Sequence, residues 1–272
     1  MHNKLNELKR ILRECGRVTV AFSSGVDSTF LLKVASDTLP KENVLAVVIT
    51  SEFSPKKELD EAVSFCSKEN IKCVQIEGHP LSSEDVSKNP KDRCYHCKKL
   101  MFSKIKDLDE AKGSVVLEGS NVDDLSDYRP GMKAVKELSI RSPLMEAGLT
   151  KAEIRALSKE LNLKTWDKPS AACLASRVAY GERLTKDKLE KVEKAEDILH
   201  ENGFKQVRVR FHENNGSSIA RIELMQSDIV RFLELQNEDS IAEKIKNLGF
   251  TYVTIDCFGY RMGSMNEAID TN

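Results

Sequence analysis

Apolar, β-branched runs alternate with amphipathic helical patterns along the first half of the chain, and few folds accommodate that order. The apolar runs lie at 17–23, 43–50, 71–78 and 114–120. Helical patterns separate them, for example at 28–39 and 56–70. This β-α-β-α order predicts an α/β fold, in which a mostly parallel sheet is covered by helices on both faces and ligands bind where the strands end.

The pattern changes at about residue 183. A charged helical stretch at 185–203 is followed by strand-like runs at 205–212, 217–224 and 250–260. This mixture predicts a smaller α+β domain. For a chain of 272 residues we therefore predict two domains, over 1–182 and 183–272, with the boundary at the end of a segment rich in small and turn residues.

Charge and hydropathy exclude several classes of protein. The 42 Lys and Arg residues nearly balance the 43 Asp and Glu residues, so no overall positive field gathers nucleic acid. Residues 183–272 carry 13 basic and 16 acidic side chains, a net charge of 13 − 16 = −3. No apolar stretch reaches the roughly 18 residues of a membrane span. The N-terminus is a charged amphipathic helix, which predicts a cytoplasmic protein without a secretory signal.

The turn after the first predicted strand reads Ser-Ser-Gly-Val-Asp-Ser. Gly25 can take a positive φ and let a ligand approach the backbone, while Asp27 or Ser28 can cap the following helix. The backbone N–H groups then point into one concavity, which suits a phosphate or pyrophosphate. The loop residues are Ser23, Ser24, Gly25, Val26, Asp27 and Ser28. The loop lacks the lysine of a Walker loop and the three glycines of a dinucleotide fingerprint, and an ordinary capped turn is the alternative.

The chain has 7 cysteines, which in a reducing compartment are core residues, metal ligands or nucleophiles. Cys94 and Cys97 form a C-x-x-C, and Cys173 stands further along. A structural zinc ion normally has four protein ligands. His96 could serve as a further ligand, but it lies between the two cysteines, where its ring would tend to point elsewhere. Three thiolates suit a 4Fe-4S cluster with one iron open to bind sulfide. We expect the others to be small core residues, namely Cys15, Cys66, Cys73 and Cys257.

The glycine-containing turn resembles the S-G-G-x-D-S loop of the ATP pyrophosphatases, the PP-loop superfamily. Ser24 stands where that pattern has its first glycine, and a serine can adopt the loop if its φ is negative. A second segment, Gly119 to Asp124, resembles the superfamily's Gly-Ser/Thr-x-x-Asp-Asp element lining the nucleotide. The resemblance implies an adenine nucleotide alpha hydrolase-like sheet and ATP cleaved between its α- and β-phosphates. Asp123 and Asp124 could then hold Mg²⁺ on the phosphates, with Asp27 as a further candidate ligand; a solvated loop is the alternative for the second segment.

Further motifs extend the resemblance along nearly the whole chain to the LarE family, namely YRPGMKAV, CLASRVAYGERLT, VRVRFH, ARIEL and GFTYVTIDCFGYRMGSMNE. This family comprises ATP-dependent sulfur transferases that make the nickel-pincer nucleotide cofactor of lactate racemase. The resemblance implies that a carboxylate of pyridinium-3,5-biscarboxylic acid mononucleotide is adenylated and converted to a thiocarboxylate, in a homo-oligomer. Some members sacrifice the sulfur of their own cysteine, whereas others resemble this chain in having three cysteines and pass sulfide through a cluster. Cys94 and Cys97, together with Cys173, favour the cluster route.

Basic residues complete the predicted site. Lys98 and Arg177 are candidates to neutralise phosphate or the adenylate, with plain surface charge as the alternative. Arg208 and Arg210 lie two apart on one face of a strand, near Glu223, where two guanidinium groups can grip a mononucleotide phosphate. The alternative there is a solvent face with cross-strand ion pairs.

Three other functions compete with sulfur transfer to a mononucleotide. A tRNA thiolase would share the loop, but the charge of −3 over 183–272 is poorly suited to RNA. An amide-forming synthetase that uses ammonia would leave the three cysteines unexplained. A nonenzymatic nucleotide- or metal-binding module would bind ATP without releasing pyrophosphate.

Overall fold

The computed structural model describes residues 1–126, 130–169, 172–236 and 240–267. The chain forms two compact units, of which the first comprises Met1–Pro80 and Asp92–Ala171 and the second Leu81–Lys91 and Ala172–Asn272. The units change over between Ala171 and Ala172, within the turn-rich segment at whose end we predict the domain boundary. The boundary at 182/183 stays a prediction about independently folding domains.

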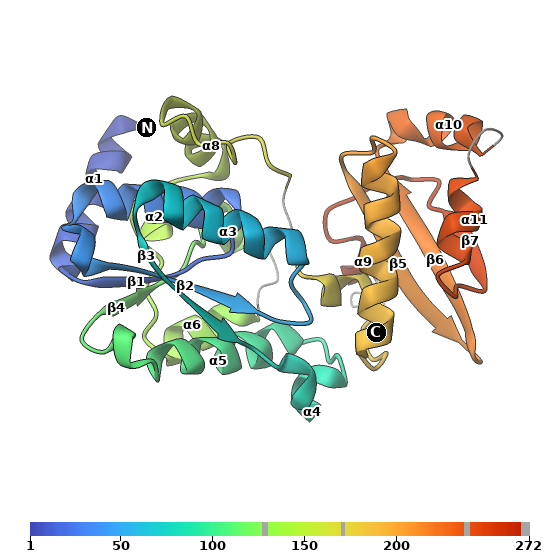
Figure 1. Cartoon of the computed structure of the whole chain (residues 1–272), viewed down its shortest axis with the longest axis horizontal. Helices are drawn as coiled ribbons and strands as arrows, with labels where there is room; N and C mark the ends of the chain where they lie inside the picture. The colour runs from blue at the N-terminus through green and yellow to red at the C-terminus, as the bar shows by residue number, and fades with distance from the viewer. Residues whose placement is uncertain (127–129, 170–171, 237–239, 268–272) are drawn as a thin grey trace. The chain divides into compact units, whose positions relative to one another are not determined.

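The first unit is built on a parallel sheet of strand order β3-β2-β1-β4 (Figure 1). Its strands are β1 (Val18–Ala21), β2 (Val44–Thr50), β3 (Lys72–Glu77) and β4 (Val115–Leu117). In the register of the sheet, Val18 lies opposite Val44 on one side and Val115 on the other. The chain therefore moves outward from β1 through β2 to β3 and then returns to the opposite side of β1. Such a reversal leaves a crevice beyond the ends of β1 and β4, where ligands of open α/β sheets bind.

Helices cover both faces of this sheet (Figure 1). One face carries α1 (His2–Cys15), α2 (Val26–Thr38), α3 (Lys56–Glu69) and α8 (Lys151–Glu160), and the other carries α5 (Arg93–Lys106) and α6 (Gly131–Glu137). Strand β2 explains the arrangement, because Ala46 packs into the core beneath α1 and α2 whereas Val47 packs into the core beneath α5 and α6. A strand buried on both faces needs apolar residues throughout, which is why β2 is a continuous apolar run.

The second unit contains a three-stranded sheet of order β5-β6-β7. Strands β5 (Val207–Asn214) and β6 (Ser217–Leu224) are antiparallel, and β7 (Tyr252–Ile255) pairs with β6 in parallel. Asn215 and Gly216 join the hairpin with φ values of 49° and 79°, as a type I′ turn requires. The helices of this unit are α4 (Glu84–Ser87), α9 (Lys186–Glu201), α10 (Gln226–Leu235) and α11 (Ile241–Lys246).

The observed architecture confirms the predicted fold class, a helix-covered parallel sheet followed by a small α+β region. One further short α-helix is α7 (Pro143–Glu146). The described residues also contain six short 3-10 helices: η1 (Lys41–Asn43), η2 (Pro80–Ser82), η3 (Asp109–Ala111), η4 (Val122–Ser126), η5 (Leu174–Arg177) and η6 (Ser264–Asn266). Within the described ranges, no helix is both long and apolar enough to cross a membrane.

Candidate active site

The loop between β1 and α2 has its left-handed residue at Ser24, with a φ of 51°. Gly25 is extended, with φ −74° and ψ 166°. The prediction that Gly25 supplies a positive φ is therefore wrong, as is the expectation of a negative φ at Ser24. A left-handed serine costs about 1 kcal/mol relative to relaxed backbone. Contacts on both sides hold it: Ser24 Oγ donates to the Glu58 carbonyl at 3.1 Å, and Lys168 Nζ donates to the Ser24 carbonyl at 3.2 Å.

Helix α2 begins without a side-chain cap. Gly25 is its N-cap residue, and the predicted capping by Asp27 or Ser28 is wrong because both lie inside the first turn. Ser28 Oγ instead donates to the Gly25 carbonyl at 3.3 Å and lies 3.1 Å from Ser23 Oγ. The first backbone N–H groups of a helix lack intrahelical acceptors, so an uncapped start is well suited to receive an anion.

Gly119 brings the end of β4 against this helix start. A Cβ at Gly119 would lie 3.1 Å from the Ser28 backbone nitrogen and 3.3 Å from its Cα, which is too close for most side chains. By contrast, a Cβ at Gly25 would meet Ser23 Oγ at 3.5 Å, an ordinary contact. A side chain at 119 would therefore require the backbone at Ser28 to shift, whereas one at 25 would not.

Asp27, in the first turn of α2, is held by two residues from later in the chain. Lys151 Nζ lies 2.5 Å from Asp27 Oδ2, and Asn121 Nδ2 donates to Asp27 Oδ1 at 3.5 Å. Burial raises the pKa of Asp27; the Lys151 ammonium opposes that shift, and the Asp124 carboxylate adds to it. Sequence reasoning did not identify Lys151. The run Thr150-Lys-Ala-Glu153 is a capping-box pattern that predicts a helix start at Lys151, but nothing in it indicates a contact 124 residues away.

The two aspartates of η4 lie at the same end of the sheet. Asp123 Oδ2 accepts from the Lys151 backbone N–H at 2.8 Å, and Asp124 Oδ2 accepts from the Asn121 backbone N–H at 2.9 Å. Within the part of the chain that the structure describes, no group of three or more His, Cys, Asp or Glu side chains could hold a metal ion. Magnesium in nucleotide sites commonly uses one or two carboxylates together with phosphate oxygens, so the oxygen donors of Asp27 and Asp123 fit its chemistry.

Lys98, on α5, lies beside the start of the segment that leads from β4 to the two aspartates. Its Nζ is 3.3 Å from Oε2 of Glu118, which is the residue before Gly119. Ser120 Oγ and Ser142 Oγ also donate to the buried Glu118 carboxylate, at 2.8 Å and 2.5 Å. Burial alone would raise the pKa of Glu118, but Lys98 and the two hydroxyls outweigh it and the pKa lies below its ordinary value. A charged, ordered Lys98–Glu118 pair therefore stands next to the loop, while the contact of Lys98 with phosphate stays a prediction.

Cys94 and Cys97 lie in the first turns of α5, three residues apart and so on one side of the helix. Both are half-buried, and Lys98 follows Cys97 directly. His96 Nε2 lies 3.3 Å from Asp92 Oδ2 and its ring meets Tyr95 edge-on. Thiolates are suitable ligands for iron-sulfur clusters, so the donor chemistry of the pair fits the predicted group.

Cys173 belongs to the second unit, where it is exposed at the start of η5. Its carbonyl accepts from Ser176 N at 2.9 Å, from Ser176 Oγ at 2.8 Å and from Arg177 Nη1 at 3.1 Å. These bonds fix the backbone that carries the thiol. Because Cys94 and Cys97 lie in the first unit, the convergence of the three cysteines stays a prediction.

Arg177 is 4% exposed and is committed to a bidentate ion pair. Its Nε and Nη2 lie 2.9 Å and 3.0 Å from the two carboxylate oxygens of Glu196, which also accepts from the Val209 backbone N–H. Burial opposes the charge of Arg177, but the Glu196 carboxylate outweighs burial and raises the pKa. The structure thus gives Arg177 a role in holding Cys173; its predicted contact with phosphate or the adenylate stays a prediction.

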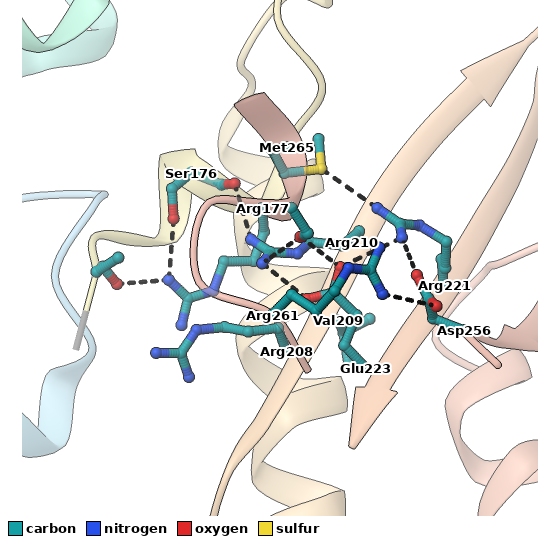
Figure 2. Close-up of polar contacts among 12 residues, drawn as sticks. Ser176, Arg177, Arg208, Val209, Arg210, Arg221, Glu223, Asp256, Arg261 and Met265 are labelled. Atoms are coloured by element: carbon teal, nitrogen blue, oxygen red, sulfur yellow. Dashed lines mark hydrogen bonds and ion pairs between the residues drawn. The ribbon is translucent and has the colours of Figure 1, made fainter. Parts of the chain in front are cut away.

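Arg208 and Arg210 lie two residues apart on β5 and so on one face of the strand, as their spacing predicts (Figure 2). They are 7% and 5% exposed, so the alternative of a solvent face is wrong. The expected cross-strand ion pair is present, since Arg210 Nη2 lies 2.8 Å from Glu223 Oε2. Ser264 Oγ donates to the other oxygen of Glu223 at 2.7 Å, which shows how the C-terminal segment covers this face.

Further arginines, which sequence reasoning missed, extend this group (Figure 2). Arg221 contacts Asp256 and lies 3.3 Å from Glu223 Oε1, and Arg261 Nη1 lies 3.3 Å from Asp256 Oδ1. We call the following residues the arginine cluster: Arg177, Arg208, Arg210, Arg221 and Arg261. The buried carboxylates among the described residues that pair with this cluster are Glu196, Glu223 and Asp256.

The five arginines of the cluster outnumber the three buried carboxylates that pair with them, and the effect is seen at Arg208. Its Nη1 donates to the Val207 carbonyl at 2.6 Å, and its guanidinium lies 5.3 Å from the centre of the Tyr260 ring. Burial and the like charge of Arg177 lower the pKa of Arg208. An anion bound here would offset both effects, and a phosphate accepts the paired donors of guanidinium groups well.

The remaining cysteines divide into two groups. Cys66 is buried in the core of the first unit, and Cys15 and Cys73 are partly buried against it. Cys257 is exposed in the turn after β7, so its expected place in the core is wrong. The reason is Asp256, whose carboxylate turns inward to the arginines and accepts from the Phe258 backbone N–H at 2.9 Å. Residues 127–129 of the YRPG region and residues 170–171 before Cys173 lie outside the described residues.

Comparison with known proteins gives similarity along both units. The family model for NAD synthase matches residues 2–98. The pyridinium-3,5-bisthiocarboxylic acid mononucleotide synthase of Lactiplantibacillus plantarum is 41% identical over 259 residues, which cover 95% of this chain and 92% of that protein. An uncharacterised protein of Synechocystis sp. is 38% identical over 270 residues, 99% of both chains. Another, of Methanocaldococcus jannaschii, is 30% identical over 264 residues, 95% of this chain and 97% of that protein.

Proposed function

This chain belongs to the LarE family of PP-loop enzymes, and from this we propose that it is an ATP-dependent sulfur transferase acting on pyridinium-3,5-biscarboxylic acid mononucleotide. The product would be a thiocarboxylate, with AMP and pyrophosphate released. The observation that supports ATP use most strongly is the uncapped start of α2, which lies against Gly119 with the Asp27 carboxylate beside it. A helix start of this kind suits the pyrophosphate of a nucleotide.

In the first proposed step, a carboxylate oxygen of the substrate attacks the α-phosphorus of ATP. The new bond joins that oxygen to phosphorus, and the bond between the α-phosphorus and the bridging oxygen to the β-phosphate breaks. Backbone N–H groups of residues 23–28 would receive the negative charge that grows on pyrophosphate. Asp27 and Asp123 would hold Mg²⁺, which neutralises phosphate charge when bound. Lys98, ordered on Glu118, would neutralise the acyl adenylate.

In the second proposed step, a sulfur nucleophile attacks the acyl carbon, a carbon–sulfur bond forms and AMP leaves. Cys94, Cys97 and Cys173 would hold a 4Fe-4S cluster, whose open iron can bind sulfide and so supply sulfur to this step. Arg177 would fix the position of Cys173, because its guanidinium binds the Cys173 carbonyl and is itself held by Glu196. A sulfide anion is nucleophilic without a general base, so this step needs no further proton acceptor.

The arginine cluster would bind the phosphate of the mononucleotide. Arg208 is buried beside like charges, and an incoming phosphate would relieve that repulsion. The Nε of Arg210 is also buried without a hydrogen-bond partner among the described residues, so donor capacity exceeds acceptor capacity here. Glu223 would fix Arg210 in place, since the two side chains share a buried ion pair.

We also propose that the chain works as a homo-oligomer. Support comes from large apolar side chains that are exposed on the second unit, where α10 presents Val230 and Leu233 three residues apart, 63% and 55% exposed. Phe258 and Met262, in the segment after β7, are 72% and 77% exposed. Exposed apolar groups of this kind are typical of surfaces that associate. The expected partners are therefore further copies of this chain, the mononucleotide and sulfide.

The test is anaerobic reconstitution with iron and sulfide, followed by turnover with ATP and the mononucleotide. We expect a thiocarboxylate product, AMP and pyrophosphate, with the mass of Cys173 unchanged after many turnovers. A single turnover that leaves dehydroalanine at residue 173 would instead show that the cysteine is sacrificed. Cys257→Ser is the matched control for Cys173→Ser, since both cysteines are exposed in the second unit. Thiolation of tRNA with no product from the mononucleotide would contradict the proposed substrate.

A further inference from the structure

Arg93 is a buried cation to which the proposed mechanism gives no role. It is the first residue of α5 and is 2% exposed. Its Nη2 donates to Cys94 Sγ at 3.6 Å, a hydrogen-bonding distance for the large sulfur atom. Lys98, which follows Cys97, is instead directed to the Glu118 carboxylate at 3.3 Å. A buried guanidinium therefore lies against the first sulfur of the cysteine pair.

The backbone that carries Cys94 is held by packing against α6. Gly131, the first residue of that helix, is buried, and a Cβ there would lie 3.4 Å from the Cys94 carbonyl oxygen and 2.8 Å from Lys98 Cδ. The two helices therefore approach each other closely at the turn that carries the thiol. Arg93 precedes Cys94 on the same helix, so one packed element holds both the sulfur and its donor.

A cation next to a ligand sulfur changes what that sulfur contributes to a cluster. A guanidinium stays charged and carries N–H donors in a fixed geometry, and a thiolate sulfur can accept from them. Hydrogen bonds to the ligand sulfurs and the local charge are among the factors that set the reduction potential of an iron-sulfur cluster. Because reduction adds negative charge, a cationic donor favours the reduced state and raises the potential. For the same reason it favours binding of a further anion, such as hydrosulfide.

We infer that Arg93 is a positioning residue that donates to the Cys94 sulfur, raises the reduction potential of the cluster and strengthens binding of hydrosulfide at the open iron. This inference rests on the proposed function, because it requires that Cys94 ligates a 4Fe-4S cluster. It adds to that function a residue that acts through a ligand sulfur and helps to load the sulfur donor.

The test uses the full chain after anaerobic reconstitution with iron and sulfide. A redox titration followed by EPR measures the reduction potential, and an optical titration with hydrosulfide measures its affinity. We expect Arg93→Gln to have a lower potential and to bind hydrosulfide about tenfold more weakly, as loss of a hydrogen bond from a charged donor does. Arg93→Lys keeps the cation and should recover part of both. Arg141→Gln is the matched control, because Arg141 Nη1 donates to Cys15 Sγ at 3.2 Å, away from the pair, and should change neither value.

A second measurement does not depend on the glutamine variant. In protein whose arginine side chains carry a heavy nitrogen isotope, pulsed EPR of the reduced cluster should detect a coupling to that nitrogen that Arg93→Lys lacks. Identical couplings in the unaltered protein and Arg93→Lys would overturn the inference, even if Arg93→Gln does not fold.

The outcomes also separate this inference from the proposed function. If the unaltered protein assembles the cluster and Arg93→Gln matches it in both potential and hydrosulfide affinity, the inference fails while the proposed function stands. If the unaltered protein assembles no cluster, the proposed cluster fails and the inference falls with it.

Discussion

The two units hold their charged groups in opposite ways. In the first unit, Lys151 and Asp27 form an ion pair at the loop through a single contact between Nζ and Oδ2. Their side chains are 27% and 22% exposed. In the second unit Arg177 and Glu196 form a bidentate pair with side chains 5% and 10% exposed. Exposed pairs exchange partners at little cost, whereas breaking a buried pair leaves a charge without solvent or partner. The first arrangement suits a site that must admit and release ATP, and the second suits a scaffold that holds the backbone of Cys173 in place.

The largest expected effect is on the stability of the second unit. Glu196→Ala removes the partner of a buried guanidinium and should lower the free energy of unfolding by about 3–5 kcal/mol. Asp27→Ala in the first unit should change it by about 1 kcal/mol or less. Urea denaturation, followed by hydrogen exchange of residues 207–211 for the second unit and of residues 44–50 for the first, measures both. Equal losses in the two variants would contradict the contrast between the units.

Arg208→Met sharpens the description of the second unit by separating stability from binding. Methionine fills much of the same volume, and removal of a cation that Arg177 repels should leave the free energy of unfolding within about 1 kcal/mol. Affinity for the mononucleotide should fall more than tenfold, because a charge-assisted contact to its phosphate is lost. Calorimetric titration with the mononucleotide measures this loss. Unchanged affinity would show that the phosphate binds elsewhere.

In the first unit, alanine substitutions at Gly119 and Gly25 can be compared with each other, because both glycines lie at the nucleotide loop. Gly119→Ala places a Cβ 3.1 Å from the Ser28 nitrogen, so backbone must move, and we expect a loss of about 1 kcal/mol in unfolding free energy. Gly25→Ala meets only ordinary contacts at a φ of −74°, so the protein should keep its stability while the methyl group hinders the phosphates. Thermal unfolding and binding of α,β-methylene-ATP check both. A large loss of stability in Gly25→Ala would mean that the glycine serves the fold.

The smallest effect concerns acid pH and the start of α8. Lys4, together with the capping box, holds the pKa of Glu153 at about 2, below its ordinary value of 4.5. A depressed folded-state pKa stabilises the fold above pH 4.5, and that stability is lost as the pH falls toward 2. Glu153→Gln should therefore be less stable than the unaltered protein at neutral pH, with the difference shrinking as the pH falls toward 2. A difference that does not change with pH would assign the effect to the cap's hydrogen bonds alone.

Sequence patterns predicted the sheet well because they depend on local chemistry. The apolar runs of β1 and β2 had to be strands buried on both faces, and the first turn had to lie at the carboxyl end of the sheet. The backbone conformation of that turn could not be predicted from the sequence. Gly25 was the natural choice for a positive φ, but Ser24 adopts it because Glu58 and Lys168, distant in sequence, bind its hydroxyl and carbonyl.

The candidate site shows the same limit. A spacing of two placed Arg208 and Arg210 on one face of β5, but their burial depends on cover from the segment around Ser264, which no local pattern reveals. Lys151 was missed because its partner lies 124 residues away. Sequence spacing thus predicted which charged residues lie on the same face of an element. Whether each charge is buried in a fixed ion pair or is free to exchange partners depends on tertiary contacts, which local patterns do not reveal.

The central claim is that ATP activates a carboxylate of the mononucleotide, and an isotope measurement tests it directly. The substrate is prepared with a heavy oxygen isotope in its carboxylates, and the products of one turnover are analysed by mass spectrometry. The account predicts that one heavy oxygen appears in AMP for each thiocarboxylate formed, and that pyrophosphate carries none. Heavy oxygen in inorganic phosphate with formation of ADP, or AMP without any label, would contradict adenylation of the carboxylate.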